Sequence, residues 1–469
     1  MKSDTIKDTN DDLSRYKVLG MNIKGNHFKN WFSSGLMNEF DEFFISQVQD
    51  FWKENYDRKI DPSLHTAFMN LTNKKDPRLI PSRIMQREIL PVLNDYTMSH
   101  FYRDKNLYDI IINPTRSVET LLRNINGTYF DSNHKPVKSS DVMTILLNSH
   151  SALIIKPSKT NNGDGIKKIE IKENQIYLNK QRVTVEDLEE IYHENFIIQK
   201  ELKQHPNLAA PHPASVNTLR MVTFRWKNEI KYLLAFARFG SNNDIRDNAN
   251  VDTSPRVGIS DSGEFYDIGV SHTGQRFTHH PSTGFCFADL KPIPNFDEFK
   301  QFVIDCHKKI LHLNFVSWDI VVGIDGKPIF LEANFAGSTS FYQLAAQKSM
   351  FGDLTEEVLN YVRDEHKVRE PVLMSKHRRK IEEREKRKQE NLIIKYKKRV
   401  SELKKKNKKL EKSKLNLEKE IVAEQQKLLQ IEKSHKRETR KLKKQYNNVV
   451  NSKSYRYTKP LRKLMNWFK

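Results

Sequence analysis

The stretch 315–334 constrains the fold most, because it holds two apolar runs separated by Asp325-Gly326. An Asp-Gly pair between apolar runs is the strongest short signal for a β-hairpin with a two-residue turn. Asp319 and Glu332 stand at equal distances from this turn. We therefore expect the two carboxylates to lie opposite each other, with Asn334 two residues along on the same face.

Two carboxylates that face each other across strands repel unless a cation lies between them. Together with the amide oxygen of Asn334 they form an all-oxygen set, which suits Mg²⁺. The alternative is an exposed sheet edge where two acids meet by chance, and the apolar residues that flank them disfavour it. The metal hypothesis predicts that Glu332→Gln relieves repulsion and leaves the metal-free protein at least as stable as the parent.

Upstream, an apolar run at 153–157 places Lys156 before a loop, 158–165, that contains Gly163 and Gly165. Glycines let backbone N–H groups close on phosphate oxygens, and a lysine adds a point charge. A lysine before an Asn/Gly turn is also common in ordinary surface hairpins. The chain has no Walker-type or paired-glycine dinucleotide fingerprint.

Two further apolar runs, 218–222 and 234–238, each carry one arginine, Arg220 and Arg238. A charge inside an apolar strand must be paired or must bind an anion. An internal ion pair is the simpler explanation for either arginine alone. Their position between the lysine loop and the hairpin favours a role toward a phosphate and a substrate carboxylate.

The remaining pattern predicts an α+β protein in four parts. Residues 1–99 read as helical, with an irregular start over 1–25. Short β-rich runs at 100–365 alternate with helical patterns at 115–126, 185–193 and 296–313. Residues 371–450 are expected to form a basic C-terminal coiled coil, and 451–469 a basic aromatic tail. Apolar runs are too short for a membrane helix, and Cys286 and Cys306 suggest no disulfide framework, so we expect a cytoplasmic protein.

Residues 371–469 hold 34 Lys+Arg against 11 Asp+Glu, whereas the rest of the chain holds 46 against 48. Such a segment suits phosphates, anionic lipid or acidic polymers. A heptad fits from Tyr396 to Ile431, but Lys414 and Glu424 occupy two of its core positions. A dimeric coiled coil and a solvated single helix both remain open.

These parts, in this order, resemble the ATP-grasp superfamily over about residues 100–365. Lys105 and Lys156 look like its two ATP lysines, and the loop with Gly163 and Gly165 like its phosphate loop. The run 196–202 is similar to the adenine hinge. The set Asp319, Glu332 and Asn334 matches the metal triad. The closest likeness is to the sugar-transfer-associated ATP-grasp domain, related to glutamate ligases, through 217–220, 280–284 and 316–319.

The resemblance implies an ATP-grasp fold, in which two α/β subdomains clasp ATP, and a carboxylate-amine ligase that works through an acyl phosphate. It implies ATP and two Mg²⁺ ions as cofactors. Carried over to this sequence, the site comprises catalytic Arg220 and Arg238, ATP-binding Lys105, Lys156, Gly163, Gly165, Gln199, Glu201 and Leu202, metal-binding Asp319, Glu332 and Asn334, and His280 toward the substrate. Residues 203–210 lack the acid that many relatives use for ribose, which leaves His205 as a stand-in.

The segment 452–462 resembles a tail found on bacterial surface-polysaccharide glycosyltransferases. It suggests a sugar acid or glycan precursor as substrate in polysaccharide or capsule biosynthesis. The expected partners are polysaccharide-assembly enzymes or an anionic membrane surface, with a homodimer through the coil as an option. A ligase that adds amino acids to a protein, and a nucleic-acid or ribosome-binding protein, remain alternatives. The tail lacks interleaved aromatics until its last residues, which disfavours nucleic acid.

Overall fold

The computed structural model describes residues 8–149, 151–160, 163, 165–242, 254–337, 339–372 and 376–465. The chain divides into two units, Met1–Glu370 and Pro371–Lys469. The first is α+β, as the sequence predicts, with two antiparallel sheets and helices packed on them. The division into four parts stays a prediction.

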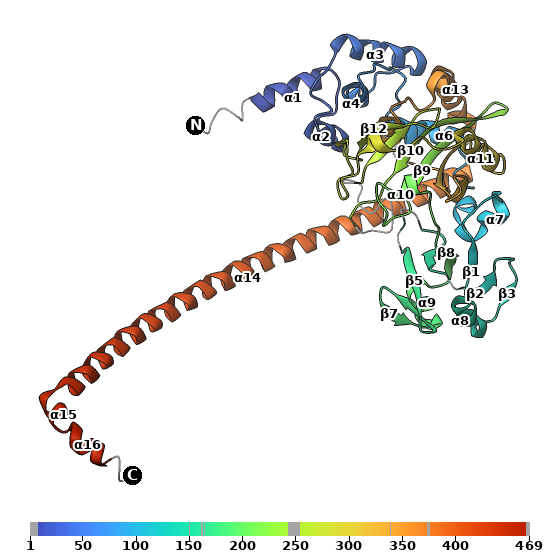
Figure 1. The fold of residues 1–469 in the computed structure, drawn as a ribbon. Helices are drawn as coiled ribbons and strands as arrows, with labels where there is room; N and C mark the ends of the chain where they lie inside the picture. Colours follow the sequence, from blue (N-terminus) through green and yellow to red (C-terminus); the bar gives the residue numbers. More distant parts are fainter. Residues whose placement is uncertain are drawn as a thin grey trace. The chain divides into compact units, whose positions relative to one another are not determined.

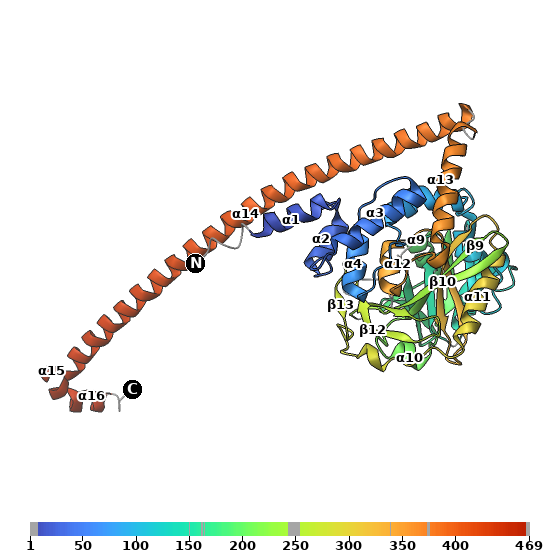
Figure 2. The same ribbon diagram turned by 90° about the horizontal axis from the view of Figure 1, so that it is seen from above.

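The N-terminal helices pack against the body of the first unit. In α3, Asp41 caps the first turn by accepting a hydrogen bond from the Phe44 backbone amide at 2.9 Å. Phe44, Val48 and Trp52 recur at helical spacing and are buried in a core shared with strand residues such as Phe236. Figure 2 shows α4 beside α12 (Thr339–Ala346), and the two helices are in contact. The helices are α1 (Asp8–Val18), α2 (Asn26–Ser33), α3 (Glu42–Tyr56), α4 (Ser63–Thr72), α5 (Ser82–Ile84), α6 (Leu90–Leu93) and α7 (Tyr108–Ile111). The irregular start predicted for residues 1–25 is therefore wrong for α1.

An eight-stranded sheet has the order β3-β2-β1-β8-β4-β5-β6-β7. Helices α8 and α9 cover it through Val142, Leu146 and Leu188 (Figure 1). The helix predicted at 115–126 is wrong, because Thr120–Ile125 pairs with β2 on one side and β8 on the other. The elements are β1 (Thr120–Ile125), β2 (Thr128–Asp131), β3 (Pro136–Val137), α8 (Ser139–Leu147), β4 (Leu153–Pro157), β5 (Lys167–Lys172), β6 (Gln175–Leu178), β7 (Gln181–Val183), α9 (Val185–Tyr192) and β8 (Asn195–Lys200).

A seven-stranded sheet has the order β13-β12-β11-β10-β9-β14-β15. Strand residues alternate between its faces, so Leu219 and Met221 pack under α11, while Val222 and Phe224 join the core with α3 and α12. The elements are β9 (Thr218–Trp226), β10 (Glu229–Arg238), β11 (Arg256–Ile259), β12 (Phe265–Val270), β13 (Arg276–Phe277), β14 (Phe315–Val322), β15 (Pro328–Asn334), α10 (Pro206–Ala209), α11 (Phe296–Lys308), α12 (Thr339–Ala346) and α13 (Thr355–Val372).

The hairpin β14–β15 pairs Asp319 with Glu332, as predicted, but its turn is not the one expected. Gly323 and Lys327 close a loop of three residues, and Gly326 takes the left-handed conformation at φ 77°. This loop alone would put Asp319 out of register. An extra residue in β15, Leu331, is bulged between the pairs Ile320–Phe330 and Asp319–Glu332 and restores the facing carboxylates.

The second unit consists of α14 (Lys376–Asn451), α15 (Lys453–Tyr457) and α16 (Lys459–Met465). Helix α14 is unbroken over 76 residues, and its heptad core residues Leu410, Leu417, Ile421 and Leu428 are 57–64% exposed. Across the described residues, no helix has the length and apolarity to cross a bilayer.

Candidate active site

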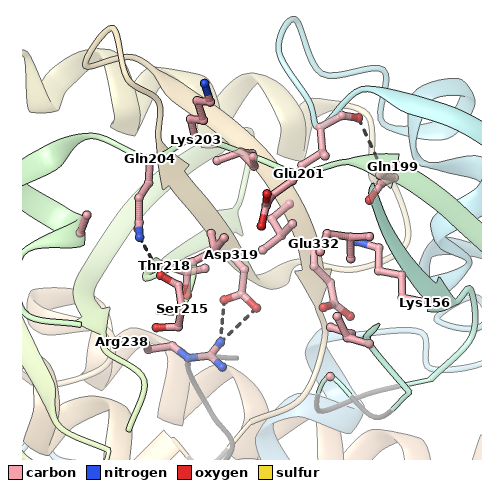
Figure 3. A pocket seen from close by; sticks show the side chains of 18 of the residues that line it. Lys156, Gln199, Glu201, Lys203, Gln204, Ser215, Thr218, Arg238, Asp319 and Glu332 are labelled. Carbon is pink, nitrogen blue, oxygen red and sulfur yellow. Dashed lines mark hydrogen bonds and ion pairs between the residues drawn. The ribbon is translucent and has the colours of Figure 1, made fainter. Parts of the chain in front are cut away.

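A cavity of about 510 Å³ is lined by residues of both sheets. Strands β4 and β8 contribute from the eight-stranded sheet, and β9, β10, β14 and β15 from the other. Figure 3 shows Lys156 and Glu332 on one side of this cavity, and Asp319 with Arg238 on the other. Ten of the thirteen predicted site residues line it: Lys156, Gly163, Gln199, Glu201, Leu202, Arg220, Arg238, Asp319, Glu332 and Asn334.

Asp319 is held by two guanidinium groups. It lies opposite Arg220 on β9, whose Nε is 2.7 Å from Asp319 Oδ1. Arg238 Nη1 lies 3.1 Å from both carboxylate oxygens, and Asn334 Nδ2 donates to Oδ2 at 3.1 Å. The ion pair considered for each arginine is therefore present, and it is made with a residue of the predicted metal triad.

Glu332 has a lysine partner of its own. Its Oε1 lies 3.2 Å from Lys105 Nζ, and the lysine also donates to the Thr160 carbonyl at 2.7 Å. Lys105 is buried and does not line the cavity. Because Asp319 and Glu332 are each neutralised by protein cations, the expectation that only a metal ion makes their pairing tolerable is wrong. Glu332→Gln should therefore destabilise the metal-free protein instead of leaving it at least as stable as the parent.

Lys156 is a buried cation on β4 that lines the cavity. Burial, and then the charge of Lys105, lower the pKa of the Lys156 ammonium from 10.5 to about 8, while Glu332 acts in the opposite direction. A cationic group held in a low dielectric next to a second cation is destabilised until an anion arrives. The site is therefore prepared for a strongly anionic ligand.

The two loop glycines have different positions. Gly163 lines the cavity, whereas Gly165 does not. Gly165 adopts φ 80°, and a Cβ there would stand 2.8 Å from Pro157 Cγ, so a side chain is excluded on both grounds. The Tyr192 hydroxyl also donates to the Gly165 carbonyl at 2.9 Å. Residues 161, 162 and 164 of the predicted phosphate loop lie outside the described residues.

The segment after β8 forms a further wall. Gln199 Nε2 donates to Thr120 Oγ1 at 3.2 Å, and Glu201 forms an ion pair with Lys168 at 2.6 Å. Leu202 shares the wall with further apolar residues, Val118, Ile154, Ile166 and Leu331. Apolar lining residues of this kind suit a flat heterocycle.

The sequence analysis did not predict several of these lining residues. Ile154 could have been found, because it stands two residues before Lys156 and shares its strand face. Leu331 could not, since its place depends on the bulge. Lys203, Gln204 and Ser215 also line the cavity, and Gln204 Nε2 donates to the Ser215 carbonyl at 2.6 Å.

Neither candidate histidine lines the cavity. His280 is buried, with Nε2 at 2.8 Å from the Gly240 carbonyl and Nδ1 accepting from the Ser282 amide at 3.3 Å. Burial lowers its pKa, so the ring is held neutral as part of the loop. His205 caps α10 by accepting from the Asn207 amide at 3.3 Å.

A family model described as sugar-transfer associated ATP-grasp matches residues 63–358. The chain belongs to the sugar-transfer associated ATP-grasp family. The match confirms the predicted ATP-grasp fold and the assignment to the ATP-grasp ligases. It begins at the first residue of α4, so it also takes in part of the helical region before residue 100, where the resemblance in the sequence begins. No curated protein matches the chain.

Solved structures of ATP-grasp ligases are similar to this family member at low identity. The D-alanine–D-alanine ligase of Bacillus anthracis is 14% identical, with a TM-score of 0.33, over 58% of this chain and 72% of that one. The ligase of Coxiella burnetii is 10% identical, with a TM-score of 0.34, over 60% and 63%. The ATP-grasp ligase PsnB, in complex with minimal precursor, Mg and ADP, is 13% identical, with a TM-score of 0.33, over 58% and 62%.

ATP-grasp enzymes use ATP and Mg²⁺. Within the described residues, no three His, Cys, Asp or Glu side chains gather in a way that could hold a metal ion. The donor set of this chain is two carboxylates and one amide, Asp319, Glu332 and Asn334, all lining the cavity. Mg²⁺ is commonly held by one or two carboxylates, with phosphate oxygens and water completing its shell. The residues therefore fit Mg²⁺ bound together with a nucleotide.

Proposed function

We propose that this family member is an ATP-dependent carboxylate-amine ligase that acts through an acyl phosphate. The observation that supports this most is the concentration of four cationic side chains, Lys105, Lys156, Arg220 and Arg238, around Asp319 and Glu332, two of the carboxylates that line the cavity. Four cations against two acids leave a surplus that a polyphosphate would neutralise. Phosphoryl transfer is promoted mainly by positioning and charge neutralisation, which is what such a set supplies.

In the first step an oxygen of the substrate carboxylate attacks the γ-phosphorus of ATP. The bond from that phosphorus to the β,γ-bridging oxygen breaks, and ADP leaves with the electron pair. Lys156 would hold the α- and β-phosphates, joined by Lys105 once its ion pair with Glu332 opens, and the apolar residues next to Leu202 would take the adenine. Arg220 and Arg238 would turn from Asp319 toward the transferring phosphoryl group and the substrate carboxylate. Asp319, Glu332 and Asn334 would hold Mg²⁺, which supplies charge neutralisation; the number of ions stays a prediction.

In the second step the amine nitrogen attacks the acyl carbon, the bond from that carbon to the phosphate oxygen breaks, and phosphate leaves. A proton passes from the nitrogen to the departing phosphate as the amide forms. The cavity's role here is to orient the two substrates and to keep water from the acyl phosphate. The guanidinium groups that held the substrate anion would also stabilise the departing phosphate.

We further propose a sugar acid or glycan precursor as a substrate, in bacterial surface-polysaccharide biosynthesis. The association of the family with sugar transfer supports this, as does the likeness of 452–462 to a tail of polysaccharide glycosyltransferases. The basic C-terminal unit is suited to an anionic membrane surface where such precursors are assembled.

The test uses purified protein with Mg-ATP and a panel of uronic acids, amino acids, nucleotide sugars and peptides. Phosphate and ADP should appear only with the right acid. Hydroxylamine should then trap the acyl phosphate as a hydroxamate. AMP with pyrophosphate would rule out the acyl-phosphate mechanism, and turnover with peptides but not sugar acids would rule out the glycan substrate.

A further inference from the structure

The C-terminal helices α14, α15 and α16 together carry their charge in three blocks. Residues 376–410 hold 17 Lys+Arg against 5 Asp+Glu, and 433–465 hold 12 against 1, but 411–432 hold 4 against 5. The near-neutral block also contains the heptad core residues Leu417, Ile421 and Leu428, which are exposed. Two copies of a helix repel each other least where the net charge is small, which favours a coiled coil at the centre of α14.

Two charged residues, Lys414 and Glu424, interrupt this central seam. In a parallel in-register dimer each would face its own copy, so that one core layer holds two ammonium groups and another holds two carboxylates. Both layers would be repulsive in a partly desolvated core. Within the single helix, Lys414 reaches Glu418 at 3.8 Å and Glu424 reaches Lys427 at 3.4 Å, but these pairs are highly exposed and weak.

An antiparallel arrangement of the two helices removes both repulsive layers. If two copies of α14 cross with Lys419 at the centre, Lys414 of each copy faces Glu424 of the other. The same register pairs Leu417 with Ile421 and Leu410 with Leu428. Every layer from 410 to 428 is then complementary.

We propose that α14 pairs with α14 of a second copy of this chain as a short antiparallel coiled coil centred on Lys419. Charge complementarity selects this occupant, because the same segment supplies both members of each charged layer. Outside 410–428 the register places Asn407 against Ile431, so the apolar seam ends there. The two Lys376 ends would stand about 130 Å apart along the pair, at 1.5 Å per residue.

The affinity of this dimer should rise with ionic strength. The basic blocks on both sides of the centre repel each other. Glu418 would also lie beside Glu418 of the second copy, and Glu420 beside its Glu420. Salt screens these exposed repulsions more than it screens the partly buried Lys414–Glu424 layers. A parallel coil held together by exposed lysine-glutamate pairs would weaken with salt instead.

Cysteine cross-linking of the full-length protein tests the orientation. In a background with Cys286→Ser, the double variant Leu410→Cys, Leu428→Cys should give a covalent dimer on mild oxidation. Neither single variant should do so, because each cysteine faces a leucine. Covalent dimers from the single variants would show a parallel coil and overturn the proposal, as would a monomeric parent in light scattering at all concentrations and salt levels tested.

Charge reversal provides the matched control. Lys414→Glu and Glu424→Lys should each weaken dimerisation at least about tenfold, a change of ~1.4 kcal/mol. The double reversal should restore it, because the opposite charges again face each other. In a parallel coil the reversals exchange one like-charged layer for another, so unchanged affinity in the single variants would also contradict the antiparallel pairing.

Discussion

Glu332→Gln tests the electrostatic balance of the site. The substitution keeps the shape of the side chain but leaves Lys105 without its carboxylate, 3.2 Å away, and removes the charge that favours the ammonium form of Lys156. Breaking a fully buried ion pair costs about 3–5 kcal/mol. Because the Glu332 side chain is 21% exposed, we expect a loss of roughly 2 kcal/mol in the ligand-free protein at pH 7.

The measurement is a thermal melt in the presence of a chelator and without nucleotide. The matched control is Glu119→Gln, which removes the same charge from an ion pair with Lys200 whose side chains are 63% and 35% exposed. That exposed pair is worth at most about 1 kcal/mol, so the control should melt close to the parent. A ligand at 100 times its Kd adds about 2.7 kcal/mol, and Mg-ATP should give this increment to the parent and the control but not to Glu332→Gln.

The outcome that refutes this reasoning is equal melting of Glu332→Gln and the control. The carboxylate would then not be offsetting the buried lysines. A mutant that is destabilised but still gains fully from Mg-ATP would separate the two roles, and would remove Glu332 from the proposed Mg²⁺ ligands.

Three other predictions follow from the same geometry. Because the folded-state pKa of Lys156 lies near 8, below its ordinary value of 10.5, its destabilising contribution is fully present below pH 8 and disappears as pH rises toward 10.5. ATP binding at pH 8–9 should therefore take up protons, which calorimetry in buffers of different ionisation enthalpy measures. Lys156→Arg should abolish this uptake. Gly165→Ala should weaken ATP binding and lower the melting temperature. The control Gly127→Ala has a similar φ of 81° but nothing within 4 Å of the added Cβ, so it should suffer only the backbone strain. Equal effects of the two substitutions would show that the contact with Pro157 does not matter. Deletion of 371–469 should spare ATP turnover while reducing dimerisation and membrane association, and a folded truncation without turnover would contradict independent units.

The candidate site could be predicted from the sequence where it depends on strand periodicity and chain order. A strand turns alternate residues to one face, so Lys156, Arg220, Arg238 and Asp319 could be assigned to a common site from their spacing and from the resemblance. Periodicity also identified the heptad of α14 and the charged residues that interrupt it. These features are local, and few alternative backbone conformations compete with them.

The pairing of the charges and the position of residues such as Leu331 in the cavity wall could not be predicted, because they depend on contacts between distant segments. Asp-Gly predicts a hairpin, but not its loop length. The three-residue loop shifts the pairing of β14 with β15 by one residue, and the bulge at Leu331 shifts it back. That the two shifts cancel depends on packing across the whole sheet. The run 120–125 forms a strand because β2 and β8 satisfy its backbone on both sides, which overrides its helical pattern. Arg220 and Arg238 stand 99 and 81 residues before Asp319 in the sequence, and no local pattern could specify that both hold it.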